Sequence, residues 1–329
     1  MAAMPKRVLG RTGLSVSALG LGTAEIGYVY GIGPRNVPSE SEATDLLRRT
    51  VELGITFIDT AHFYGDAEER IGKSDIARRP GVIISTKCGH ALDRGKILHE
   101  AALARAFQSE VDESLRKLKL DVIPLLQVHG GTAERIRDGS IINAVQKLKD
   151  AGKVKWAGIS TRGEEAPLAA IESGFFDTLQ LAYSILDQRM AARVFAAAKE
   201  KNIGIINRSV LLKGALTPAS QYLSPTLTDL KRNSERAEKI ARELGTDLPA
   251  LAIRFALSNN AINTVLVGSN KIKNIERAVA AAEAGPLPAD VIEKIRELAV
   301  TDEKQVDPKW WPAETVSDEI RHNNHEARP

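Results

Sequence analysis

The chain has 329 residues, 43% hydrophobic and 26% charged, and lysine plus arginine exceed aspartate plus glutamate by only three, 45 against 42. Such values are typical of a soluble globular protein, and balanced charge without a dense basic block argues against nucleic-acid binding. No segment approaches the ~18 apolar residues of a membrane span and no signal-peptide pattern opens the chain, so we expect a cytoplasmic protein.

Short apolar runs alternate with amphipathic stretches along the chain. The opening segment could form a hairpin around Gly10 to Gly13. Eight later runs are nearly continuous in apolar character, which is typical of strands buried on both faces of a parallel sheet. They are Ser17–Leu21, Thr56–Thr60, Val82–Lys87, Val122–Val128, Trp156–Ser160, Thr178–Ala182, Gly204–Arg208 and Thr264–Gly268.

Apolar residues at helical spacing fill the intervals between these runs. Several of the stretches are followed by glycine (Gly54, Gly152, Gly174 and Gly285), where a left-handed helix cap is expected. We predict helices at Ser41–Leu53, Glu100–Leu118, Ile141–Asp150, Glu164–Ser173, Gln188–Lys201, Pro249–Ser258 and Lys271–Ala284, with an extra helix at Ala289–Ala299.

Eight strand–helix units predict an α/β fold, a (β/α)8 TIM barrel with an N-terminal β-hairpin. An open doubly wound sheet with appended helices is the alternative. No composition break divides the chain, so we expect residues 1–329 to form a single barrel domain. Its tail, roughly 301–329, would either cover the substrate or be partly disordered.

Three long connections are expected, at Thr23–Ser39, Leu212–Lys231 and Thr301–Pro329. Long connections in a compact barrel are often binding loops or lids. Aromatic residues in the first and last of them could line a substrate mouth: Tyr28, Tyr30, Trp310 and Trp311.

Four side chains with proton chemistry stand at or just after the ends of consecutive predicted strands: Asp59, Tyr64, Lys87 and His129. Barrel enzymes carry their reacting residues at the C-terminal strand ends, so these four should meet. Lys87 follows an apolar run and needs a carboxylate partner, for which Asp59 is the candidate. This pair would make Tyr64 a usable acid or base near neutral pH, and His129 could orient a carbonyl oxygen.

Other interpretations of these residues stay open. Each of the four could be structural, and Cys88, the single cysteine, could be a reactive thiol or a small residue at a strand end. Lys87 could instead form a Schiff base in an aldolase or isomerase. A zinc or iron hydrolase could use Asp59, His62, His90, His99 and His129, but none of these shows metal-ligand spacing, and we expect no metal.

Taken together, the residues resemble the aldo-keto reductase superfamily from Arg7 to about residue 300. The motifs that carry the resemblance are Arg7–Leu14, Leu19–Thr23, Ile58–Gly65 with Glu68–Gly72, Ser85–Lys87, Gln127–His129, Lys153–Ser160 and Val267–Ser269.

The resemblance implies a barrel that binds an extended nicotinamide cofactor and moves hydride between this cofactor and a carbonyl carbon. Tyr64 would be the general acid in reduction and the base in oxidation, with Asp59 and Lys87 tuning it and His129 orienting the carbonyl. The positions that match cofactor-binding residues are Gly22, Thr23, Ser160, Thr161, Gln180, Arg208, Ser209, Leu211, Gly268, Ser269, Lys271 and Asn274.

Two of these positions depart from the family pattern. Thr161 stands where asparagine is usual, and Arg208 stands where many members stack an aromatic ring on the nicotinamide. A guanidinium can also stack, but its charge would resist formation of cationic NAD(P)+ and could attract an anionic or polar substrate. The cluster expected to bind the 2′-phosphate is also thin, because Lys271 and Asn274 stand where two cations are common. Lys271 at a helix start nevertheless favours a phosphate, and hence NADP (NADPH) over NAD.

The expected function is therefore an NAD(P)(H)-dependent oxidoreductase that interconverts an aldehyde, ketone or sugar and its alcohol. Its partners would be a small-molecule carbonyl or alcohol, with no nucleic acid and no membrane, and it would be a monomer or a homo-oligomer. The alternative is a non-catalytic, cofactor-binding regulatory subunit of the same family, against which the intact set of four residues argues.

Overall fold

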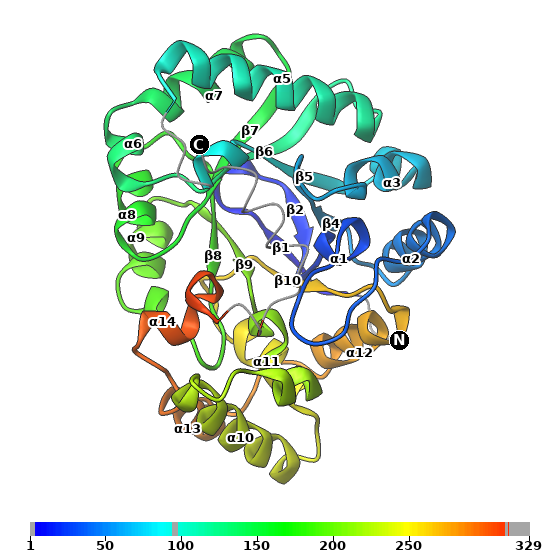
Figure 1. Ribbon diagram of the computed structural model, residues 1–329, viewed down its shortest axis with the longest axis vertical. Helices are drawn as coiled ribbons and strands as arrows, with labels where there is room; N and C mark the ends of the chain where they lie inside the picture. Colours follow the sequence, from blue (N-terminus) through cyan, green and yellow to red (C-terminus); the bar gives the residue numbers. More distant parts are fainter. Residues whose placement is uncertain (1–3, 94–97, 313–314, 316–329) are drawn as a thin grey trace.

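A computed structural model of the protein describes residues 4–93, 98–312 and 315. In this part of the chain, an N-terminal hairpin precedes a closed barrel of parallel strands surrounded by helices (Figure 1). The hairpin strands β1 (Lys6–Val8) and β2 (Ser15–Ser17) pair in antiparallel register. The barrel confirms the predicted (β/α)8 fold with its hairpin, and the open-sheet alternative is wrong.

Eight strands make up the described barrel, which closes where the last strand pairs with the first. The strands are β3 (Leu19–Gly22), β4 (Phe57–Asp59), β5 (Ile83–Cys88), β6 (Ile123–His129), β7 (Val154–Ser160), β8 (Thr178–Ala182), β9 (Gly204–Arg208) and β10 (Thr264–Gly268). Each matches a predicted run to within two residues at either end. One predicted run divides, because Ser17 ends β2 and the Ala18 N–H bonds back to Pro5 in the hairpin.

Helices alternate with the barrel strands and form the outer layer (Figure 1). They are α1 (Ala24–Gly27), α2 (Glu40–Glu52), α3 (Ala67–Ser74), α4 (His90–Asp93), α5 (Glu100–Leu118), α6 (Ala133–Arg137), α7 (Ser140–Asp150), α8 (Glu165–Glu172), α9 (Val194–Glu200), α10 (Thr228–Glu243), α11 (Leu248–Leu257), α12 (Ile272–Glu283), α13 (Ala289–Arg296) and α14 (Glu303–Val306). Short 3-10 helices lie at Gly10–Thr12, Ile76–Arg78, Arg189–Ala191, Leu212–Gly214, Pro218–Tyr222 and Pro308–Trp310.

Local signals explain where most helices begin and end. At the start of α2, Ser39 accepts from the Glu42 N–H while the Glu42 side chain accepts from the Ser39 N–H, a complete capping box. The four glycines predicted as left-handed caps all have positive φ. The predicted helix at Gln188–Lys201 is regular only from Val194, because Arg189–Ala191 forms a 3-10 turn.

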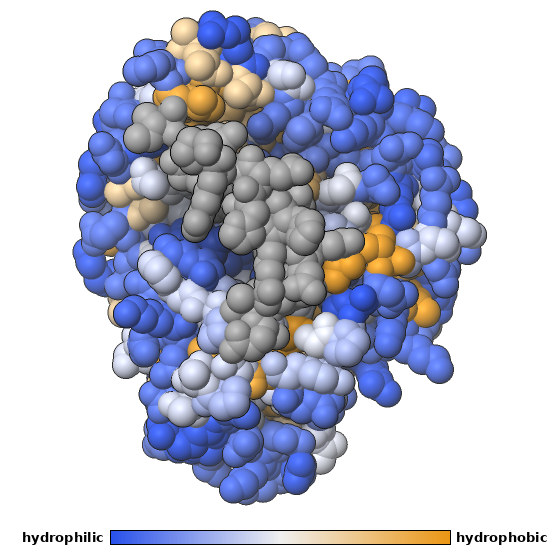
Figure 2. All heavy atoms as spheres, in the orientation of Figure 1, coloured by the Kyte–Doolittle hydropathy of each residue, from blue (hydrophilic) through white to orange (hydrophobic). Residues whose placement is uncertain are grey.

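The helix α10 is the main element that the sequence prediction missed. Its first residues were assigned to the long connection Leu212–Lys231, and no helix was predicted between that connection and Pro249. The face that α10 buries carries Leu230, Asn233, Ser234, Ala237 and Ala241, so few large apolar residues mark its period. Its outer face is hydrophilic, as is most of the surface over it at the bottom of Figure 2.

Two hydrophobic clusters hold the barrel together. The larger one lies between the strands and the surrounding helices. The smaller one contains Leu9 and Val16 of the hairpin segment together with strand residues Phe57, Ile83, Leu125, Ile206 and Leu266. Since Leu9 and Val16 belong to the hairpin, we infer that the hairpin covers the N-terminal end of the barrel and leaves the C-terminal end for binding. No described helix is long and apolar enough to cross a bilayer.

Candidate active site

A cavity of about 940 Å³ opens at the C-terminal ends of the barrel strands. Its lining includes the last residues of β3, β4, β6, β7, β9 and β10, together with the long connections after β3 and β9. Every candidate catalytic or cofactor-binding residue predicted from the sequence belongs to this lining except Lys87. The topology therefore brings the predicted site residues together at one rim.

Lys87 and Asp59 form the buried ion pair that the sequence predicted. The Lys87 Nζ lies 2.6 Å from Asp59 Oδ2 and donates a second bond to the Thr60 carbonyl at 2.8 Å. Lys87 is only 2% exposed, and burial lowers the pKa of its ammonium while the charge of Asp59 opposes that shift. Because Lys87 does not line the cavity and is held by two acceptors, the geometry argues against a Schiff-base role.

The other carboxylate oxygen of Asp59 is held by two amides. Gln127 Nε2 and Gln180 Nε2 donate to Asp59 Oδ1 over 3.0 and 2.8 Å. Ser160 Oγ in turn contacts Gln180 Oε1 at 3.4 Å. The ion pair is thus linked by hydrogen bonds to two of the residues predicted to bind the cofactor, Gln180 and Ser160.

Tyr64 lies beside the ion pair in the loop that follows β4. The Lys87 Nζ is 4.9 Å from the centre of the Tyr64 ring, and the His129 ring centre is 6.3 Å from it. A Cβ on Gly27 would meet the Tyr64 carbonyl oxygen at 1.8 Å. Only glycine therefore allows α1 to pack so closely against the loop that presents Tyr64.

An aromatic wall continues from Tyr64 around the cavity. Phe63 and His90 stack with ring centres 3.6 Å apart and nearly parallel, and Tyr28 lies 5.8 Å from Phe63. Of the four aromatics predicted at the mouth, Tyr28, Tyr30 and Trp311 line the cavity, whereas Trp310 is 51% exposed and is not in the lining. The expected tail, roughly 301–329, is described up to Pro312 and at Thr315, and the rest of it lies outside the described residues.

The alternatives built on histidine and cysteine find little support. The His62 Nε2 contacts Glu113 Oε2 of α5 at 2.9 Å, away from the cavity lining. Among the described residues, no group of three or more histidine, cysteine, aspartate or glutamate side chains could hold a metal ion. Cys88 is buried, and burial raises the pKa of its thiol well above the usual value, which favours a packing role.

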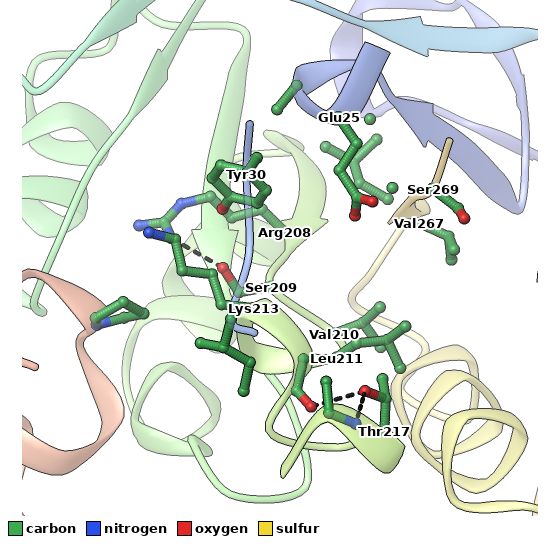
Figure 3. Close-up of a pocket in the computed structure, with 18 of the residues that line it drawn as sticks. Glu25, Tyr30, Arg208, Ser209, Val210, Leu211, Lys213, Thr217, Val267 and Ser269 are labelled. Carbon is green, nitrogen blue, oxygen red and sulfur yellow. Dashed lines mark hydrogen bonds between the residues drawn. The ribbon is translucent and has the colours of Figure 1, made fainter. Parts of the chain in front are cut away.

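Basic side chains gather at one end of the cavity. Arg208 donates to the Thr161 carbonyl at 3.0 Å and to Ser209 Oγ at 3.2 Å, while the Lys213 Nζ lies 4.9 Å from the centre of the Tyr30 ring (Figure 3). Burial and the nearby charge of Arg162 lower the pKa of Lys213 to about 8. Neither Arg208 nor Lys213 has an ion-pair partner among the described residues, so these two cations favour the binding of an anionic group at this end of the cavity.

The loop that carries these groups is strained. Ser209, Leu212 and Lys213 have φ values of 61°, 43° and 56°, a region that residues other than glycine seldom occupy. Such strain costs stability and is concentrated at ligand-binding segments. Lys213 was not predicted from the sequence, because its position inside this irregular loop has no periodic signal.

The far end of the cavity is polar and holds the start of α12. Ser269 Oγ accepts from the Lys271 N–H at 3.1 Å and from Asn274 Nδ2 at 3.0 Å. Glu25 projects toward this end (Figure 3), where burial raises its pKa against the opposing charge of Arg35. Arg277, one helical turn after Asn274, also lines the cavity. The sequence prediction missed this second cation, although its spacing on the predicted helix would have revealed it.

Comparisons with known proteins agree with this geometry. The sequence model of the aldo/keto reductase family matches residues 18–300. L-galactose dehydrogenase of Arabidopsis thaliana is 32% identical over 289 residues, covering 84% of this chain and 87% of that protein. D-threo-aldose 1-dehydrogenase of Pseudomonas sp is 28% identical over 309 residues, covering 83% and 92%. The holo form of aldo-keto reductase AKR11C1 from Bacillus halodurans superposes with a TM-score of 0.75 and 28% identity, covering 92% of this chain and all of that one.

Proposed function

The chain belongs to the aldo/keto reductase family, and from this membership and the site geometry we propose that it is an NAD(P)(H)-dependent oxidoreductase with Tyr64 as its general acid and base. It would interconvert a carbonyl compound and the matching alcohol. The observation that carries the proposal is the buried ion pair, whose ammonium lies 4.9 Å from the Tyr64 ring at the floor of the cavity.

The ion pair gives Tyr64 a setting suited to proton transfer. A cation close to a phenol stabilises the phenolate, and Arg208 is near enough to Tyr64 for its charge to act in the same direction. In reduction, Tyr64 Oη would give its proton to the substrate oxygen as the carbonyl carbon receives hydride. In oxidation, the same oxygen would take the proton back from the alcohol. His129 would orient the substrate oxygen toward Tyr64.

The residues present fit a nicotinamide cofactor, which when bound would supply or accept the hydride. Thr161 is buried, lines the cavity, and its Oγ1 has no hydrogen-bond partner in the described part of the chain. This orphaned hydroxyl supports a contact with the carboxamide, alongside Ser160 and Gln180. The single hydroxyl of Thr161 would thus form the hydrogen bond to the carboxamide that the side-chain amide of the usual asparagine would form.

The charges of the cavity suggest how the rest of the cofactor would be held. Lys213, which lacks an anionic partner, is a candidate for the diphosphate. Lys271 and Arg277 line the polar end, where the free amides at the start of α12 also favour an anion. Two cations at that end favour NADPH, which carries an additional phosphate, over NADH.

The wall above Tyr64 suggests a hydroxylated substrate. Tyr28, Phe63 and His90 offer flat faces next to polar groups, an arrangement that suits a sugar or a similar polar carbonyl compound. The names of two relatives, L-galactose dehydrogenase and D-threo-aldose 1-dehydrogenase, also favour a sugar substrate. We therefore place sugars ahead of simple aldehydes and ketones.

The test measures oxidation of the reduced cofactor in the presence of a panel of sugars, aldehydes and ketones. The absorbance of the reduced nicotinamide monitors the reaction. Activity that disappears in Tyr64→Phe, while cofactor binding persists, would support the proposal. Cofactor binding without turnover of any carbonyl or alcohol would instead favour a regulatory subunit.

A further inference from the structure

Gln127 of β6 is fully buried and is not part of the cavity lining. Its Nε2 donates to Asp59 Oδ1 at 3.0 Å and to Ser85 Oγ at 2.7 Å. Because an ionised carboxylate only accepts hydrogen bonds, the amide nitrogen must face Asp59, and this fixes the orientation of the side chain.

The amide is held in this orientation at a cost. Its other atom, Oε1, is buried without a hydrogen-bond partner among the described residues. A buried orphan of this kind is unfavourable and calls for an explanation. A methionine would fill the same space without any orphan, so the polar group is kept for its donor.

A neighbouring strand makes room for Gln127. At Gly158 of β7, a Cβ would meet Gln127 Cγ at 3.1 Å and Thr178 Oγ1 at 2.2 Å. The absence of a side chain at Gly158 thus leaves the space inside the barrel that the Gln127 side chain occupies. Both residues lie in motifs that support the family resemblance, although neither is among the four proposed catalytic residues, Asp59, Tyr64, Lys87 and His129.

Gln127 acts on the carboxylate that faces Lys87. Asp59 accepts from Gln127 and Gln180 on Oδ1 and from Lys87 on Oδ2. Hydrogen bonds to a carboxylate stabilise its charged form and share its charge. Gln180 lines the cavity and would also contact the cofactor, whereas Gln127 does not line it, so only Gln127 can act on Asp59 without touching the cofactor.

We propose that Gln127 is a positioning residue that keeps the Asp59 carboxylate directed at Lys87 and takes up part of its negative charge, and that it thereby sets the acidity of Tyr64. This inference rests on the proposed function. Without the Gln127 donor, more of the negative charge of Asp59 acts on Lys87 and Tyr64. The phenolate then becomes less favourable, and a higher pH is needed to form it.

The test compares Gln127→Met with Ser85→Ala in the full-length enzyme. Gln127→Met removes both hydrogen bonds of Gln127, whereas Ser85→Ala removes only the bond to Ser85 and keeps the donor to Asp59. The readout is the acidic limb of the pH profile of kcat for alcohol oxidation, which reports formation of the Tyr64 phenolate. We expect this limb to shift by about 0.5–1 pH unit to higher pH in Gln127→Met and to stay in place in Ser85→Ala.

The inference would be overturned if the acidic limb of the pH profile lay at the same pH in Gln127→Met and the wild type. Equal shifts of this limb in Gln127→Met and Ser85→Ala would also overturn it. If Gln127→Met does not fold, Gln127→Asn serves in its place, because its shorter amide cannot span both Ser85 and Asp59. Tyr64→Phe separates the two proposals. If it keeps full activity, the proposed function fails, whereas an inactive Tyr64→Phe with an unshifted Gln127 variant rejects the positioning role alone.

Discussion

Arg208 and Thr161, the two residues that depart from the family pattern, are in direct contact: the Arg208 Nη2 donates to the Thr161 carbonyl at 3.0 Å. The guanidinium is therefore fixed against the strand end where the carboxamide is proposed to bind. It forms no ion pair in the described part of the chain, although the carboxylate of Asp307 is near enough for its charge to act on the guanidinium. Because Arg208 and Thr161 are joined by this hydrogen bond, we treat the two departures from the family pattern as coupled rather than independent.

We predict that Arg208→Tyr shifts the cofactor preference toward the oxidised form. A fixed cation next to the nicotinamide disfavours the positive ring of NADP+ more than the neutral ring of NADPH. Removing it should raise the affinity for NADP+ relative to NADPH by roughly threefold to tenfold, a difference of the size expected for one partly screened charge. Titration of both forms against the variant and the wild type measures this ratio. An unchanged ratio would show that Arg208 does not act on the ring.

We predict that Tyr64→Phe lowers kcat by about 10²–10⁴-fold, the usual loss when a general acid is removed. The affinity for NADPH should change little, because the phenol is proposed to contact the substrate and not the phosphates. Tyr28→Phe is the matched control, since Tyr28 also lines the cavity and lies 5.7 Å from the Tyr64 ring. Comparable losses in the two variants would assign the proton to another group.

The barrel and much of its site follow from local patterns. Several strands are apolar runs that end in a polar residue, and in a parallel barrel those ends must share a rim, so the positions of Asp59 and His129 could be predicted from the sequence. The ion pair with Lys87 could be predicted because a buried ammonium needs a counter-charge.

Other features depend on contacts that have no sequence period. The link from Gln127 to Asp59 joins residues on different strands and requires Gly158 on a third. Lys213 comes to face the cavity through a loop with left-handed residues, whose path follows no propensity rule. Helix α10 buries small and polar residues, so its apolar period is faint although its hydrophilic face is regular.

We predict that NADPH binding weakens as the pH rises above about 8. The pKa of Lys213 is lowered to about 8 by burial and by the charge of Arg162, so the free protein loses this cation in that range. A lysine attracts phosphate only while protonated; hence affinity is retained below the pKa and lost above it. Bound phosphate would hold the proton more firmly and delay its loss in the complex.

Lys213→Met tests the origin of this dependence. It should weaken NADPH binding at pH 7 and flatten the decline between about pH 7.5 and 9. Lys155→Met is the control, because Lys155 is an exposed lysine near the start of β7 and does not line the cavity. A decline of the same steepness in Lys213→Met would mean that another group is responsible.

We predict that NADPH is preferred over NADH and that Lys271 and Arg277 create the preference. Both line the polar end of the cavity, and neither forms an ion pair in the described part of the chain, although the buried Glu25 is near enough for its charge to act on Lys271. A phosphate held by a lysine or an arginine gains a charge-assisted hydrogen bond worth about 1.5–3 kcal/mol, or roughly tenfold to 100-fold in affinity. Lys271→Ala and Arg277→Ala should each weaken NADPH binding within that range and leave NADH nearly unaffected. Parallel losses for the two cofactors would place these cations against a group that both share, and the preference would then have to arise elsewhere along the cavity.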